Sequence, residues 1–96
     1  MSPAIAERSY GPDHPKVATR LNNFAMFLKQ VGRTHEAEPM YRRAFTIHEK
    51  SYGFDHPEVA LVLSNLGVLL KDAGRLGEAE PLLRRALSID ERAWGE

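Results

Sequence analysis

The stretch that decides the fold is Tyr52-Gly53-Phe54-Asp55-His56-Pro57-Glu58-Val59-Ala60, because an earlier stretch, Tyr10-Gly11-Pro12-Asp13-His14-Pro15-Lys16-Val17-Ala18, carries the same pattern. The offset between the two is 52 − 10 = 42 residues, and it also relates Gly32-Arg33 to Gly74-Arg75. A fixed period of this length indicates a stacked repeat array. We therefore expect one domain over residues 1–96, with complete units at 11–52 and 53–96 and the last part of another unit at 1–10.

The composition narrows the classes of partner. The 96 residues carry 13 basic and 13 acidic side chains, and this balance lacks the positive charge expected of a protein that binds nucleic acid or an anionic membrane. The chain contains no cysteine, which excludes disulfides and thiolate chemistry. No apolar run is long enough to span a bilayer, and the N-terminal residues do not have the pattern of a signal peptide. We expect a soluble, cytoplasmic chain with protein partners.

Each unit predicts a pair of helices. In the first unit, the apolar residues Val17, Leu21, Phe24, Ala25 and Leu28 recur at helical spacing, which predicts a helix from Pro15 to about Val31. The second helix of that unit is expected from about His35 to Tyr52, with Thr34 as its N-cap. The second unit repeats the pair over about 57–73 and 77–94, and no segment alternates with the period of a strand.

Small residues recur where the two helices of a unit would cross, at Ala25/Gly67, Ala37/Ala79 and Ala44/Ala86. This spacing resembles the tetratricopeptide repeat, whose usual period is about 34 residues. The longer period, with the Gly-x-Asp-His-Pro-x-Val-Ala and Leu-x-Asn-x-Ala/Gly signatures, is similar to the subclass found in kinesin light chains. The resemblance implies an all-α, right-handed α-solenoid of antiparallel helix-turn-helix units, with about two and a half repeats.

The resemblance also implies a concave groove lined by the first helix of each unit. The residues expected there are Thr19, Asn22, Asn23, Met26, Lys29, Gln30, Leu61, Ser64, Asn65, Val68, Lys71 and Asp72. Asn23 and Asn65 occupy equivalent positions, and each amide can donate to and accept from a peptide backbone or brace neighbouring helices. Lys29 and Lys71 are candidates to neutralise an acidic ligand or a C-terminal carboxylate, or are simply solvated surface charges.

The sequence offers no catalytic or metal site. His14 and His56 each stand between an aspartate and a proline, and turn structure explains them better than metal binding, since metal ligands must converge. Nucleophile elbows and phosphate-binding glycine loops are absent from the sequence. The Arg42-Arg43 pair and its equivalent, Arg84-Arg85, stand next to glutamates, which favours a salt-bridged surface. We therefore expect no enzyme activity and no cofactor.

A repeat array buries apolar surface only between neighbouring units, so the last helix is expected to leave part of its apolar face uncovered. The residues concerned are Leu82, Leu83, Leu87, Ile89 and Trp94, which predicts self-association through the end of the array. Three functions are consistent with the sequence. The first is a scaffold that binds a peptide or partner helix, the second is a structural or oligomerisation segment, and the third is a regulatory part of a larger multidomain protein.

Overall fold

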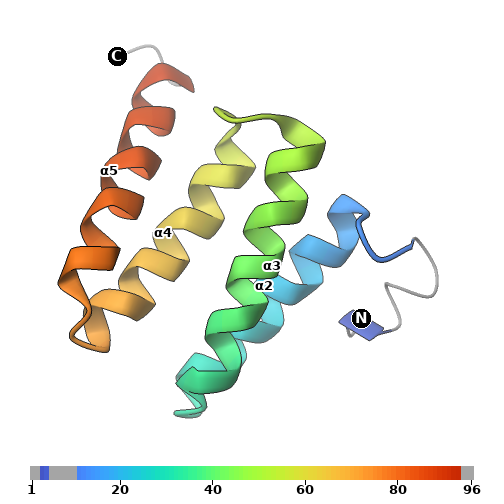
Figure 1. Cartoon of the computed structure of the whole chain (residues 1–96). Helices are drawn as coiled ribbons and strands as arrows, with labels where there is room; N and C mark the ends of the chain where they lie inside the picture. Colours follow the sequence, from blue (N-terminus) through green and yellow to red (C-terminus); the bar gives the residue numbers. More distant parts are fainter. Residues whose placement is uncertain (1–2, 5–10, 94–96) are drawn as a thin grey trace.

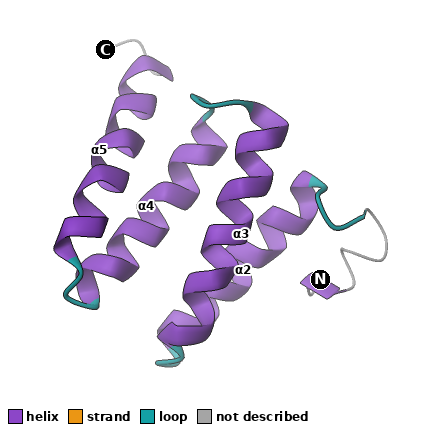
Figure 2. Cartoon of the chain, in the orientation of Figure 1, coloured by secondary structure: helices purple, strands orange, loops and turns teal. Residues whose placement is uncertain are grey.

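The structure is a computed structural model that describes residues 3–4 and 11–93. This part of the chain contains four α-helices and no strand (Figure 1; Figure 2). The helices are α2 (Pro15–Gln30), α3 (Thr34–Tyr52), α4 (Pro57–Asp72) and α5 (Leu76–Ala93). The predicted pairs are confirmed. The partial helix expected over residues 1–10 lies outside the described residues, apart from the helical Pro3 and Ala4.

The first helix of each unit begins at the repeated histidine. His14 Nδ1 accepts a hydrogen bond from the backbone N–H of Lys16 at 3.0 Å, and His56 Nδ1 accepts from Glu58 at the same distance. Each histidine is extended and is followed by a proline, whose missing N–H costs nothing in the first turn. The turn prediction for these histidines is confirmed, and the structure adds their role as N-caps.

The second helix of each unit begins differently from the prediction. Thr34 is not an N-cap but the first residue of α3, and Arg33 precedes it without a side-chain cap. The Arg33 guanidinium instead donates to the carboxylate of Glu36, with Nη2 lying 2.7 Å from Oε1. The turn before it needs Gly32, whose φ of +84° falls in the left-handed region that favours glycine.

Consecutive helices pack against each other along the chain, and α2 also approaches α4. Gly67 shows how closely two helices of a unit cross, because a Cβ at this position would lie 2.6 Å from Cδ2 of Leu83. One buried cluster joins all four helices. Its members are Ala25, Leu28, Ala37, Tyr41, Leu66, Leu69, Leu70 and Ala79. The repeat therefore has a continuous core that runs from one unit into the next.

The repeated arginines have two roles. Arg42 and Arg84 form the predicted pairs with Glu38 and Glu80 four residues earlier, at 2.9 and 3.0 Å. The following arginines hold the turns that start each unit, since Arg43 Nη2 donates to the carbonyl of Pro12 at 3.1 Å and Arg85 Nη2 donates to that of Phe54 at 3.0 Å. Two of these four arginines thus hydrogen-bond to the turns that start the units.

Burial departs from the predicted end surface at three residues, because Ile89 is buried and Leu82 and Leu83 are half-buried. Ile89 was expected at the uncovered end, but it is fully buried against Val59, Ala60 and Leu63, because it faces the other helix of its own unit. Leu82 is half-buried and packs against the same core. Leu87 is 60% exposed, as expected of the end. Trp94 lies outside the described residues.

Candidate peptide-binding groove

A cavity of about 200 Å³ lies between α2 and α4. Its lining residues are Met26, Lys29, Gln30, Tyr41, Asn65 and Val68. The structure thus brings together five of the residues expected in the groove, from helices that are equivalent in the two units. Tyr41 comes from α3 and is 98% buried, so it forms part of the cavity wall from within the core.

A side-chain hydrogen bond joins the two walls of this cavity. Asn65 Nδ2 donates to Oδ1 of Asn22 at 3.0 Å, and Asn22 is only 4% exposed. The Asn22 amide also contacts the sulfur of Met26, with Nδ2 and Sδ 3.8 Å apart. The sequence paired Asn23 with Asn65 by their repeat positions, but the structure bonds Asn65 to the neighbouring Asn22. Asn65 therefore braces α2 against α4 while it also borders the cavity.

The charges at the groove are arranged differently from the expectation. Lys29 Nζ lies 3.1 Å from Oδ2 of Asp72, so its charge is balanced by a residue of the opposite wall. Lys71 does not border this cavity but lines a separate groove along α5. Lys29 and Lys71 therefore do not converge on one ligand position, because α2 and α4 place equivalent side chains beside different neighbours.

The remaining residues predicted for the groove do not line the cavity. The Thr19 hydroxyl donates to the carbonyl of Pro15 in its own helix, at 3.2 Å. Asn23 and Leu61 are exposed, and Ser64 is half-buried. The cavity thus includes only part of the predicted groove.

Tyr41 is not among the residues that the sequence predicted for the groove, so its place at the cavity was missed. Burial raises the pKa of its hydroxyl, because ionisation would place a charge in an apolar environment. A tyrosine in an apolar helix face usually directs its hydroxyl toward a polar neighbour. This preference of tyrosine was the one signal in the sequence that could have indicated that Tyr41 borders a cavity with polar groups.

A network of ion pairs fixes the junction between the two units. Arg75, at the turn before α5, donates to Glu78 and also to Glu38 on α3, with Nη1 2.7 Å from Glu38 Oε1. Arg42 lies 3.7 Å from Glu78, which closes the network. Hydrogen bonding to Arg75 lowers the pKa of Glu38. The contact is exposed, so its contribution to stability is small.

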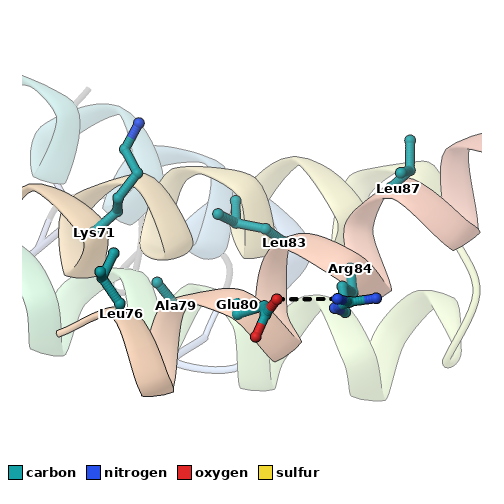
Figure 3. A pocket seen from close by; sticks show the side chains of 7 residues that line it. All are labelled: Lys71, Leu76, Ala79, Glu80, Leu83, Arg84 and Leu87. Atoms are coloured by element: carbon teal, nitrogen blue, oxygen red, sulfur yellow. Dashed lines mark hydrogen bonds and ion pairs between the residues drawn. The ribbon is translucent and has the colours of Figure 1, made fainter.

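A larger open groove of about 640 Å³ runs along the outer side of α5 (Figure 3). The close-up shows Leu76, Leu83 and Leu87 along this helix, the Glu80–Arg84 pair beside them and Lys71 reaching over from α4. The predicted end-surface residues Leu83 and Leu87 thus meet here, together with Leu76, which was not predicted for this surface.

Other kinds of site are not found in the part of the chain that the structure describes. Over residues 3–4 and 11–93, no three acidic or histidine side chains gather as metal ligands would. None of the helices described combines the length and apolarity needed to cross a bilayer.

Comparison with known proteins supports one family. Comparison with curated proteins finds no match. The family model described as tetratricopeptide repeat matches residues 19–92, which includes most of α2 and nearly all of α5. The match agrees with the sequential helix pairs, the small residues at their crossings and the continuous core. Repeats of this family are non-catalytic modules that generally bind other proteins. The chain belongs to the tetratricopeptide repeat family.

Proposed function

We propose that this chain is a protein-interaction module that binds a peptide, or one face of a partner helix, in the cavity between α2 and α4. The observation that carries the proposal is the cavity itself, which combines the apolar side chains of Met26 and Val68 with the amides of Gln30 and Asn65. Ligand sites in proteins are usually apolar pockets with a few polar groups that orient the ligand. Tyr41 adds a rigid aromatic wall.

The polar groups suit a peptide backbone. Asn65 uses its Nδ2 for the bond to Asn22, and its Oδ1 accepts no hydrogen bond from the described residues. Gln30 is exposed at the rim and has a donor and an acceptor on one amide. An extended peptide presents N–H and C=O groups in turn, so these two amides match it while an apolar side chain enters the cavity.

The charge arrangement favours a ligand without strong acidity. Lys29 is neutralised by Asp72 across the groove, and Lys71 faces another surface. A ligand carboxylate would have to displace Asp72 from Lys29, and the displaced aspartate would then repel it. We therefore infer that an apolar anchor residue, rather than a terminal carboxylate, dominates recognition.

Selection from a peptide library against the wild-type chain tests the proposal. The Met26→Ala/Gln30→Ala variant truncates two exposed residues at the cavity, and we expect selected peptides to lose affinity by about tenfold or more. The Asn23→Ala/Leu61→Ala variant changes two exposed residues of the same helices outside the cavity, so it should bind as wild type does. Circular dichroism checks that both variants remain helical.

Two results would contradict this function. One is a library that yields no enriched motif with the wild-type chain. The other is a pair of variants that lose affinity equally, which would place recognition on the whole concave surface instead of the cavity.

Finer assignments rest on the sequence. From the 42-residue period and the repeated Gly-x-Asp-His-Pro turn, we infer that the repeats are of the kind found in kinesin light chains. A cytoplasmic location and a regulatory role within a larger protein stay predictions. The alternative of an oligomerisation segment has direct support in the α5 groove.

A further inference from the structure

The 42-residue register shows which kind of neighbour would fit the outer faces of α2 and α5. Helix α4 is flanked by α3 and α5, and it buries Leu66 and Leu69 to 2% and 1% exposure. The equivalent positions on α2 are Phe24 and Phe27, which are 39% and 52% exposed, with their rings stacked 6.2 Å apart. Helix α2 thus presents outward the apolar face that α4 buries.

Helix α5 presents the opposite half of the same interface. Its Leu83 and Leu87 stand at the positions of Tyr41 and Phe45 on α3. In the interior, Tyr41 is almost completely buried and Phe45 packs between two core clusters. On α5, Leu87 is 60% exposed and, with Leu83, lines the groove of about 640 Å³ (Figure 3).

The charges at the two ends are complementary in the same register. At the interior junction, Arg75 pairs with Glu38 at 2.7 Å and Glu78 approaches Arg42 at 3.7 Å. The equivalents of Arg75 and Glu78 are Arg33 and Glu36 on the α2–α3 side, already paired with each other. The equivalents of Glu38 and Arg42 are the exposed Glu80 and Arg84 on α5.

The position that α5 would enter on the α2–α3 side is only partly filled. In repeat 2, Phe45 and Leu82 both pack against the buried cluster that contains Val59 and Leu63. The corresponding place in repeat 1 is an open volume of about 550 Å³. Its lining residues are Pro3, Ala4, Leu21, Glu36, Pro39, Met40 and Arg43. Residues 1–10 carry the repeat positions of 85–94, including the shared Ile-x-Glu-Arg.

We propose that two copies of this chain stack head to tail, with α5 of one copy on the α2–α3 side of the other in the register of the interior junction. Leu83 then covers Phe24 and Phe27, and Leu87 enters the volume beside Met40. Arg33 meets Glu80, and Glu36 meets Arg84. Lys71 of one copy stands at the position of Lys29, and Gln30 of the other copy stands at the position of Asp72. The ion pair between Lys29 and Asp72 therefore has no equivalent between the copies.

This contact joins two different surfaces, so each copy keeps one face free and further copies can add. The distinction from a symmetric dimer gives a sharp test. The Leu87→Glu variant blocks only the α5 face, and the Phe27→Glu variant blocks only the α2 face. Both side chains are exposed, so neither substitution should disturb the core, and circular dichroism checks that the variants fold. Leu61→Glu changes a leucine that is 50% exposed and lies outside both end faces, and it serves as the control.

The measurement is sedimentation equilibrium of the full 96-residue chain up to about 1 mM, a range that detects weak association. We expect wild type and Leu61→Glu to exceed the mass of a dimer as concentration rises. Each end-face variant alone should associate at least about tenfold more weakly. An equal mixture of the two variants should give heterodimers and nothing larger, because only one compatible pair of faces remains.

Three results would overturn the proposal. Wild-type chain that stays monomeric up to about 1 mM lacks the interface. Phe27→Glu that associates as wild type does would indicate a symmetric α5–α5 contact. Leu87→Glu and Phe27→Glu that fail to combine in the mixture would show that the two faces do not bind each other. None of these outcomes depends on peptide binding in the α2–α4 cavity.

Discussion

The hydrogen bond between Asn22 and Asn65 offers the sharpest test of how the two units are joined. Asn22 is 4% exposed, and among the residues that the structure describes its amide has only the Asn65 Nδ2 donor at 3.0 Å and the long contact to Met26. In the Asn65→Leu variant, the buried Oδ1 of Asn22 loses its partner. Leaving a buried polar group unsatisfied costs about 1–3 kcal/mol. For a domain of this size, 2 kcal/mol corresponds to a fall in Tm of roughly 8–16 °C.

Replacing both partners removes the unsatisfied group instead of creating it. Leucine has nearly the shape of asparagine, so the Asn22→Leu/Asn65→Leu variant should recover most of the lost stability. The expected coupling free energy between the two sites is about 1–2 kcal/mol. Asn23→Leu is the matched control, because Asn23 is exposed on the same helix, and its free energy of unfolding should change by less than about 0.5 kcal/mol.

Urea unfolding followed by circular dichroism measures these free energies, at low concentration so that association does not contribute. The reasoning would be refuted by a single Asn65→Leu variant as stable as wild type. It would also be refuted by a double variant whose loss equals the sum of the single losses. The result also decides whether Asn65 can be altered in binding studies without weakening the fold.

Two further predictions concern His48, near the end of α3, and His56, the N-cap of α4. Burial lowers the pKa of His48 below its unfolded value, so the unfolded state binds more protons and stability should fall as pH drops below about 6.5. The His48→Gln variant should show a weaker dependence of Tm on pH in thermal melts between about pH 5 and 7. His56→Ala removes the N-cap of α4 and should lower the free energy of unfolding in urea by about 0.5–2 kcal/mol, whereas His56→Asn should retain most of the cap. Equal losses in the two variants would assign the effect to the stacking of His56 on Tyr52.

The fold followed from the sequence because several independent patterns agree on one register. The histidine-proline turns, the apolar spacing and the small residues at helix crossings all repeat at 42 residues, and each has a local physical cause. The one error in capping, at Thr34, arose because a favourable cap residue was preferred to Arg33, whose side chain pairs with Glu36. Propensity is a weak guide where a side chain has a strong local partner.

The candidate site could be predicted only in part. Helical spacing identified which side chains project from α2 and α4, but not which neighbour each one meets. Lys29 pairs with Asp72 and Asn65 with Asn22, and both contacts depend on the displacement between two helices. Core packing sets how far one helix is shifted relative to the other, and a periodic sequence pattern carries no information about that shift. Ile89 was misplaced for a related reason, because its helix has two apolar sides and periodicity does not say which one lies inward.

The departures from repeat symmetry carry more functional information than the repeated residues. Ser64 stands where the first unit has Asn22, so the asparagine bridge belongs to one junction and is not a general feature of the array. Gln30 likewise replaces Asp72, so the charge pair across the cavity is also specific to this junction. A further copy stacked in the same register would reproduce the apolar contacts and the arginine–glutamate network, but not these two polar contacts. Each chain in such a stack would therefore have one distinct cavity, between α2 and α4, separated from its neighbours by junctions of different chemistry.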